Sequence, residues 1–260
     1  AEANMIGLAA GLAREGKIPF CASFTCFASR RVYDQITISV AYANTNVKIV
    51  GTAPGITQGP NGGTHMDFLD LAIMRAMPNI HVYSPCDVYE LRAVMKYMAT
   101  HYQPTYMQLL RPKMPVIFNE SFEFNPAKAS ILTEGIDVTI VTTGYTTHLA
   151  VKAVEQLRKE GINAEVVDLR TIRPLDTETL IASVKKTNRA VVVDESWPFT
   201  SIASEVSFQL QRYAFDYLDA PVVRVCGADS SMHYAPNLVE AYLPSVSKVV
   251  QAVKAVCYKS

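Results

Sequence analysis

The sequence predicts an α/β protein made of two consecutive α/β domains. Short apolar, β-branched runs alternate with segments of helical periodicity, which is typical of a mostly parallel sheet covered on both faces. A stretch rich in proline and asparagine, over about residues 112–133, interrupts this alternation, and the pattern then restarts. The length of 260 residues suits two domains of ordinary size. We expect one domain over residues 1–125 and another over residues 126–260.

The first half predicts strands and helices in alternation. Segments with apolar residues at helical spacing are expected to be helices, and short β-branched runs are expected to be strands. The expected helices are 5–14, 31–43, 66–77 and 87–100, and the expected strands are 18–25, 47–53, 80–84 and 105–110.

The second half repeats this alternation after the linker. The whole sequence shows no repeat with a period of 20–50 residues and no low-complexity tract, which excludes a repeat architecture. The expected strands are 138–143, 164–169, 190–194 and 222–225, and the expected helices are 147–160, 176–187, 201–212 and 246–256.

The composition excludes several classes of protein. The 24 Lys and Arg residues balance the 24 Asp and Glu residues, so the chain lacks the basic character that nucleic acids and acidic membranes attract. No apolar run approaches the roughly 18–20 residues that span a bilayer. The five cysteines are scattered and have no metal-ligand spacing, which indicates a cytoplasmic protein without a metal site of its own.

The most informative segment is the glycine- and proline-rich loop over residues 54–63, between an expected strand and an expected helix. Ligands of open α/β sheets bind where the strands end, so this loop is a candidate binding site. It leads into Thr64 and His65, and an imidazole there can donate or accept a proton near neutral pH. The alternative is a tight turn in which Thr64 caps the next helix and His65 is an ordinary surface residue.

Two aromatic residues and a carboxylate are further candidates. Phe24 and Phe27 follow an apolar strand and precede the basic pair Arg30-Arg31, so they either stack on a flat ring or pack in the core. Glu2 stands at the start of the first helix, where a carboxylate usually complements the helix dipole. From these residues alone, the interpretation stops at an α/β protein with a ligand-binding loop.

Five stretches of the first half recur in the order of a known family. They are Glu2-Ala-Asn-Met-Ile-Gly-Leu-Ala-Ala-Gly-Leu12, Phe24-Thr-Cys-Phe27 with Tyr33-Asp-Gln35, Gly59-Pro-Asn-Gly-Gly-Thr-His65, Pro78-Asn79 and Ser84-Pro-Cys-Asp87. Together they resemble the C-terminal half of transketolase and its thiamine-diphosphate-dependent relatives. The resemblance implies a pyrimidine-binding domain with a parallel sheet, followed by a transketolase C-terminal domain. It also implies that the first domain is truncated at its N-terminus, because about 50 residues precede this glutamate in the family.

The second half is similar to the beta subunits of 2-oxo-acid dehydrogenases, which share this domain with transketolases. The matching stretches are Leu169-Arg-Thr-Ile-Arg-Pro174, Val193-Asp-Glu-Ser-Trp-Pro198, Leu218-Asp-Ala-Pro-Val-Val-Arg-Val225 and Gly227-Ala-Asp229. The first half is closer to stand-alone transketolase C-terminal subunits. We therefore expect the C-terminal subunit of a split transketolase, which transfers a two-carbon ketol unit from a ketose, usually a phosphate, to an aldose.

The resemblance implies which residues bind thiamine diphosphate. Glu2 matches the glutamate that hydrogen-bonds the aminopyrimidine ring and drives formation of the ylid, so it is expected to be catalytic as well as cofactor-binding. Phe24 and Phe27 match the aromatic residues around that ring. Arg30 follows them on the same segment and is assigned to the same cofactor-binding group.

The resemblance also implies which residues bind the substrate. His65 matches a catalytic histidine that faces the substrate and shuttles protons. Arg111 matches the arginine that binds the terminal phosphate, and Asn61 replaces an aspartate that contacts a substrate hydroxyl. Ala53 stands where many transketolases have a substrate-facing histidine. Because Ala53 and Asn61 alter polar contacts, we expect a non-standard ketose or a sugar with another terminal anion.

The diphosphate-binding signature of the family, Gly-Asp-Gly followed by Asn-Asn, is missing from the sequence. The resemblance therefore implies a partner, the N-terminal transketolase subunit, which binds the diphosphate and Mg²⁺ through oxygen ligands. We expect an α₂β₂ assembly with sugar phosphate substrates. This chain would then hold only the pyrimidine half of the cofactor.

Three other functions stay open. The first is the beta subunit of a 2-oxo-acid dehydrogenase, which acts in decarboxylation and transfer to a lipoyl group. The second is a deoxyxylulose-phosphate synthase, disfavoured because that family carries both halves on one chain. The third is a non-catalytic transketolase-like subunit, which the residues Ala3, Ala53 and Asn61 motivate.

Overall fold

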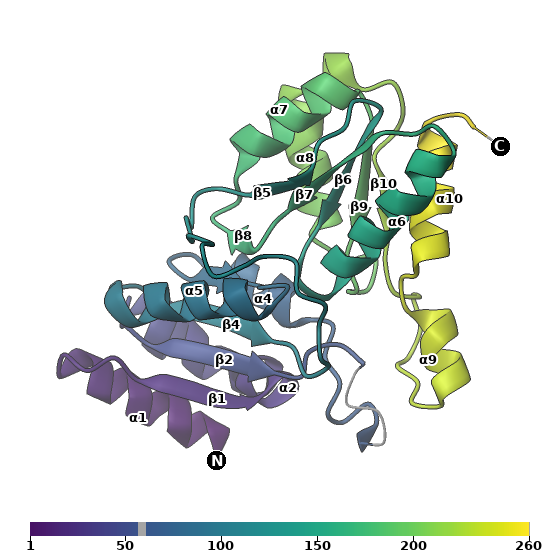
Figure 1. Ribbon diagram of the computed structural model, residues 1–260. Helices are drawn as coiled ribbons and strands as arrows, with labels where there is room; N and C mark the ends of the chain where they lie inside the picture. Colours follow the sequence, from purple (N-terminus) through teal and green to yellow (C-terminus); the bar gives the residue numbers. More distant parts are fainter. Residues whose placement is uncertain (57–60, 260) are drawn as a thin grey trace. The chain divides into compact units, whose positions relative to one another are not determined.

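The computed structural model describes residues 1–56 and 61–259, which form two compact units (Figure 1). Each unit is an α/β fold, so the expectation of two α/β domains is confirmed. Two short segments of the second half belong to the first unit. That unit comprises Ala1–Pro126, Thr171–Pro174 and Ser231–Val239, and the remaining residues form the second unit.

The sheet of the first unit has the strand order β1-β2-β4-β3-β8. Its strands are β1 (Phe20–Phe24), β2 (Lys48–Thr52), β4 (Thr105–Leu109), β3 (His81–Tyr83) and β8 (Thr171–Arg173). Strands β1 to β4 are parallel, and β8 pairs antiparallel with β3. Phe24 pairs with Thr52, and Thr52 pairs with Leu109, so β1, β2 and β4 end at the same carboxyl edge.

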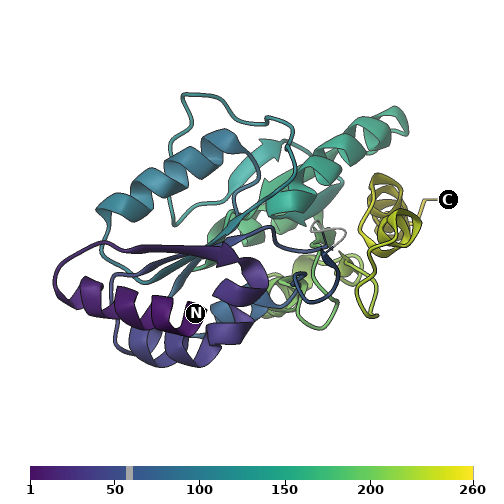
Figure 2. The same ribbon diagram turned by 90° about the horizontal axis from the view of Figure 1, so that it is seen from below.

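Helices cover both faces of this sheet, and Figure 2 shows α1 (Glu2–Arg14) and α5 (Val88–Thr100) on opposite sides of it. Helix α5 begins where the Asp87 carboxylate accepts the N–H groups of Tyr89 and Glu90. It packs through Val94 and Met98 against the sheet. Because its buried residues recur at helical spacing, α5 forms where the sequence predicted a helix.

Helix α1 buries one narrow stripe of small and apolar side chains. Ile6, Ala9, Ala10 and Ala13 are spaced i, i+3, i+4 and i+7 and are all buried. The helix ends before Gly16, whose φ of 78° suits the left-handed turn that closes a helix. Packing of this stripe fixes α1 and thereby the position of its first residue, Glu2.

Residues 31–43 were predicted to be helical, and almost all of them are, but the type of helix changes along the segment. The segment contains η1 (Arg30–Val32), α3 (Tyr33–Gln35) and the π-helix η2 (Ile36–Tyr42), and the short helix α2 (Thr25–Ala28) precedes it. Ser29 separates α2 from η1 with non-helical dihedral angles, and its hydroxyl hydrogen-bonds the backbone carbonyl of Thr25 and the distant carboxylate of Asp67. Helical periodicity identified the helical character of this segment and did not reveal the change from 3₁₀ to α to π geometry.

The helix predicted over residues 66–77 starts late, as α4 (Asp70–Ala76). The backbone of Asp67 instead pairs with Gly55, through N–H···O distances of 2.8 and 3.2 Å. The N–H of Leu69 donates to the Asp67 carboxylate at 2.8 Å. These residues therefore form the base of the loop, whose residues 57–60 lie outside the described part of the chain.

The second unit contains a sheet with the order β10-β9-β6-β7-β5. Its parallel strands are β6 (Val138–Thr142), β7 (Ala164–Asp168), β9 (Ala190–Val193) and β10 (Val223–Val225), and β5 (Ser130–Thr133) pairs antiparallel with β7. Strand β5 lies inside the stretch that was predicted to be a linker. Its side chains are mostly half-exposed, so it shows little apolar periodicity.

Helices pack in pairs on the sheet of the second unit (Figure 1). One pair is α6 (Thr147–Lys159) with α10 (Val246–Val256), and the other is α7 (Thr177–Thr187) with α8 (Ala203–Tyr213). The short helices η4 (Gly144–Thr146) and η5 (Phe215–Tyr217) also belong to this unit, whereas α9 (Pro236–Tyr242) has residues assigned to both units. Among the described residues, none of the helices combines the length and the apolar character that a membrane crossing requires.

Candidate active site

Two aromatic rings and an imidazole meet at the carboxyl edge of the first sheet. Phe24 ends β1 and Phe27 lies in α2, whereas His65 comes from the loop that follows β2. The His65 ring centroid lies 5.5 Å from that of Phe24 and 5.1 Å from that of Phe27, and the two phenyl rings lie 6.0 Å apart, all edge to face. Three residues named from the sequence thus form one group, called here the aromatic cluster (Phe24, Phe27 and His65).

Glu2 reaches this cluster through an arginine. Its carboxylate Oε2 lies 3.4 Å from Nη1 of Arg31, and the Arg31 guanidinium carbon lies 3.8 Å from the centroid of the Phe27 ring. A hydrogen bond from its own backbone N–H, together with Arg31, holds the pKa of Glu2 below its usual range. Glu2 is therefore an ionised carboxylate beside the aromatic cluster.

Arg30 contacts the base of the loop. Its Nε lies 3.7 Å from the Asp67 carboxylate, and its Nη2 donates to the carbonyl oxygen of Met66 at 3.4 Å. The basic pair is therefore divided, since Arg31 faces Glu2 and Phe27 while Arg30 faces the loop.

Asp67 anchors the loop that carries His65, and the sequence interpretation missed it. Its buried carboxylate accepts hydrogen bonds from the Ser29 hydroxyl and the Leu69 N–H, both at 2.8 Å. Burial raises the pKa of Asp67. The sequence did contain a signal for Asp67. It is an acidic residue at the apolar start of a predicted helix, two residues after the candidate histidine His65.

A buried polar network continues from Asp67 to the central strand. Asp70 accepts hydrogen bonds from the Tyr106 hydroxyl and the Gln108 amide, both at 2.7 Å, and Gln108 accepts one from the Ser84 hydroxyl at 2.7 Å. Burial, with the nearby carboxylate of Asp67, raises the pKa of Asp70 to about 7. This network fixes α4, and with it the end of the loop, against β4.

An open cavity of about 670 Å³ lies beside the aromatic cluster. Its lining residues are Cys26, Phe27, Arg30, Arg31, Gly63 and Thr64. An aromatic wall, a neighbouring carboxylate and an open space form a suitable site for a flat, nitrogen-containing ring. The residues present therefore fit the pyrimidine half of thiamine diphosphate.

The predicted substrate residues lie at the same edge of the sheet. The backbone carbonyl of the exposed Asn61 accepts the Thr64 hydroxyl at 3.4 Å, and that hydroxyl lies 2.8 Å from Nδ1 of His65. Arg111 is exposed and follows the end of β4 by two residues. Ala53 is buried with a φ of 54°, which turns the chain at the end of β2.

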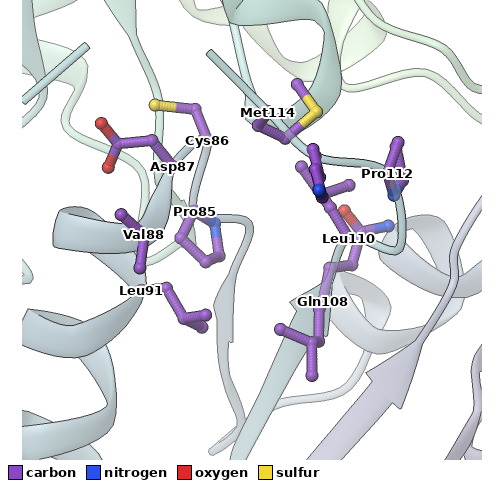
Figure 3. A pocket seen from close by; sticks show the side chains of 11 residues that line it. Pro85, Cys86, Asp87, Val88, Leu91, Gln108, Leu110, Pro112 and Met114 are labelled. Atoms are coloured by element: carbon purple, nitrogen blue, oxygen red, sulfur yellow. The ribbon is translucent and has the colours of Figure 1, made fainter. Parts of the chain in front are cut away.

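A second cavity, of about 400 Å³, lies between the start of α5 and the segment after β4 (Figure 3). Its walls are mainly apolar, and its labelled polar side chains serve the fold. Asp87 caps α5 and accepts the N–H groups of Ile117 and Phe118, and Gln108 belongs to the buried network. The lining residues are Pro85, Cys86, Asp87, Val88, Leu91, Gln108, Leu109, Leu110, Pro112, Lys113 and Met114.

The fold and the site define a two-domain α/β protein with a carboxylate and an aromatic cluster at the carboxyl edge of a parallel sheet. Residues 1–116 match the transketolase pyrimidine-binding domain, and residues 127–249 match the transketolase C-terminal domain. The chain therefore belongs to the transketolase family, whose members depend on thiamine diphosphate. The resemblance found in the sequence is confirmed.

Individual relatives place the chain near split transketolases. It is 51% identical to the 6-deoxy-6-sulfo-D-fructose transketolase subunit SqwH of Clostridium sp. (strain MSTE9) over 196 residues. The matched region spans 75% of this chain and 61% of that subunit. The chain is 37% identical to the pyruvate dehydrogenase E1 component subunit beta of Rickettsia felis, over 100% of this chain and 82% of that relative. A solved structure titled "Split gene transketolase, inactive beta4 tetramer" superposes with a TM-score of 0.90 at 36% identity, covering 99% of this chain and 82% of that one.

Proposed function

We propose that the chain is the C-terminal, pyrimidine-binding subunit of a thiamine-diphosphate-dependent transketolase. The observation that carries this proposal is the convergence of Glu2, Phe24, Phe27 and His65 from three separate segments at one sheet edge. The similarity to SqwH supports ketol transfer as the reaction. The similarity to a pyruvate dehydrogenase beta subunit makes 2-oxo-acid decarboxylation the second candidate.

Glu2 and the phenyl rings would serve the cofactor. Thiamine diphosphate, when bound, would supply a carbanion that attacks the ketose carbonyl. The ionised Glu2 carboxylate would accept a hydrogen bond from a ring nitrogen of the pyrimidine in its protonated form. Phe24 and Phe27 would orient the ring and exclude water from it, and Arg30 would keep this segment attached to the loop.

His65, Asn61 and Arg111 would serve the substrate. Because Nδ1 of His65 is engaged by the Thr64 hydroxyl, Nε2 is the atom that would hold or move a substrate proton. The Asn61 side chain would hydrogen-bond a substrate hydroxyl, and the Arg111 guanidinium would bind a terminal anion.

The donor we propose is a ketose with a terminal sulfonate or phosphate. The name of SqwH specifies a sulfonated fructose, and a guanidinium recognises sulfonate and phosphate oxygens alike. Ala53 and Asn61, which depart from the family pattern, favour a sugar other than the common phosphate donors.

We also propose that the chain works with an N-terminal subunit that binds the diphosphate and Mg²⁺, in an α₂β₂ assembly. The solved relative is titled an inactive tetramer of beta subunits, which supports self-association and the need for a partner. None of the five cysteines, all of which lie in the described part of the chain, forms a disulfide bond, which supports a reducing compartment such as the cytoplasm.

The test is to combine the full chain with the N-terminal subunit, thiamine diphosphate and Mg²⁺. Ketol transfer to an aldose is measured from 6-deoxy-6-sulfofructose and from fructose 6-phosphate, and decarboxylation is measured with pyruvate. We expect ketol transfer and no decarboxylation. Decarboxylation alone would favour the dehydrogenase subunit, and an inert complex that binds the partner would favour a non-catalytic subunit.

A further inference from the structure

A guanidinium lies where the proposed site needs its pyrimidine ring. The Arg31 guanidinium carbon lies 3.8 Å from the Phe27 ring centroid, and Arg31 Nη1 lies 3.4 Å from Glu2 Oε2. A bound aminopyrimidine would make the same two contacts, with its face on an aromatic ring and its N–H toward the carboxylate. The two groups cannot lie on the same face of the Phe27 ring at once.

We propose that Arg31 occupies the pyrimidine position in the cofactor-free chain and leaves it when the cofactor binds. The inference rests on the proposed function, since it concerns the same site. A guanidinium is flat, cationic and rich in N–H donors, so it satisfies Glu2 and covers Phe27 as the ring would. Arg31 is thus a built-in competitor of the cofactor.

The surroundings of Arg31 allow its side chain to leave. The side chain is 54% exposed, and the adjacent cavity is also lined by Cys26, Gly63 and Thr64. Its backbone is held in place by the next residue, Val32, which is fully buried. Only the Arg31 side chain therefore has to change its rotamer, and the Phe27 ring stays in place.

The competition predicts the size of the effect. An exposed ion pair and an exposed cation–π contact are both weak interactions, so their loss to the cofactor reduces its affinity only modestly. We expect removal of the competitor to tighten cofactor binding about tenfold, which corresponds to about 1.4 kcal/mol. The opposite arrangement, in which Arg31 stays and contacts the cofactor, predicts weaker binding on its removal.

The experiment measures cofactor affinity and not turnover. The full chain, assembled with its N-terminal subunit and Mg²⁺, is titrated with thiamine diphosphate by calorimetry as the wild type and as Arg31→Gln. The full chain alone is titrated with 4-amino-5-hydroxymethyl-2-methylpyrimidine and followed by NMR. The matched control is Arg92→Gln, because the Arg92 guanidinium carbon also lies over a ring, 5.8 Å from the Tyr89 centroid, on α5.

We expect Arg31→Gln to bind both ligands about tenfold more tightly and Arg92→Gln to bind them as the wild type does. Circular dichroism verifies that both variants are folded. Unchanged or weaker binding by Arg31→Gln, with a wild type that binds, would overturn the inference and leave the proposed function standing. If neither the wild type nor Arg31→Gln binds either ligand, the proposed cofactor site itself is wrong.

Discussion

The hydroxyl of Ser29 donates a 2.8 Å hydrogen bond to the carboxylate of Asp67, 38 residues further along the chain. Ser29 follows the helix that carries Phe27, and Asp67 follows His65 by two residues. Both partners are buried, so their hydrogen bond is shielded from competing water. This contact holds the loop close to the aromatic segment and thereby assembles the aromatic cluster.

Replacing Asp67 by alanine should loosen the loop. The Leu69 N–H would lose this acceptor, and the Ser29 hydroxyl would keep only the Thr25 carbonyl, so we expect the free energy of unfolding to fall by about 1–3 kcal/mol. His65 should also leave the edges of Phe24 and Phe27, and its ring protons should lose their ring-current shifts in NMR spectra. Asp67→Asn retains an oxygen acceptor and should show a smaller effect. Unchanged His65 resonances in Asp67→Ala would contradict the anchoring role.

Asp70 should make stability depend on pH. Burial raises its pKa to about 7 from 3.8, so the folded state holds this proton more tightly than the unfolded state. Its contribution to stability is therefore complete below pH 3.8 and is lost as the pH rises through about 7. Asp70→Asn keeps an acceptor for Tyr106 and Gln108 without titrating. Urea unfolding measures the stability of Asp70→Asn and of the wild type from pH 3.8 to about 7. The wild type should lose stability relative to the variant as the pH rises. A difference that stays constant with pH would contradict the raised pKa of Asp70.

A pair of glycine substitutions should separate steric crowding from helix propensity. A methyl group on Gly51, in β2, would overlap the buried Tyr106 hydroxyl, so Gly51→Ala should lower the free energy of unfolding by about 1–3 kcal/mol. Gly7 lies inside α1 with open space around it, and Gly7→Ala should stabilise the helix by up to about 1 kcal/mol. Chemical denaturation measures both changes. A well-tolerated Gly51→Ala would show that Tyr106 is free to move.

Most of the fold could be predicted from the sequence because its strands are continuous apolar runs. The final helix, Val246–Val256, has the predicted bounds, since its buried valines recur at helical spacing. Strand β8 was missed because it has only three residues, and helix α9 was missed because it follows a segment rich in turn-forming residues. The late start of α4 depends on the pairing of Asp67 with Gly55, which is a tertiary contact that no local pattern reveals.

The candidate site was predictable in part. Family motifs led to Glu2, Phe24, Phe27 and His65, which lie together in the structure. Arg31 was passed over in favour of its neighbour Arg30, because two adjacent arginines look alike in sequence and only their side-chain directions separate them.

Arg111 should control affinity for the donor. Its proposed partner is a terminal sulfonate or phosphate, so Arg111→Ala should raise KM for the anionic ketose by about 10–100-fold, the size of a lost charge-assisted hydrogen bond. The value of kcat should change little, because the contact is the same in the ground state and the transition state. Lys113→Ala, two residues further along, is the matched control for charge. A large loss of kcat with an unchanged KM would place Arg111 at the reacting atoms instead.

The central claim is that this chain supplies the carboxylate that activates the cofactor. The most direct measurement is ketol transfer by the assembled complex carrying Glu2→Ala, with Glu15→Ala as the control at the other end of α1. We predict that Glu2→Ala lowers kcat by at least about a hundredfold, within the range for general acid–base catalysis, and that Glu15→Ala is fully active. A Glu2→Ala complex that turns over at the wild-type rate would contradict the account.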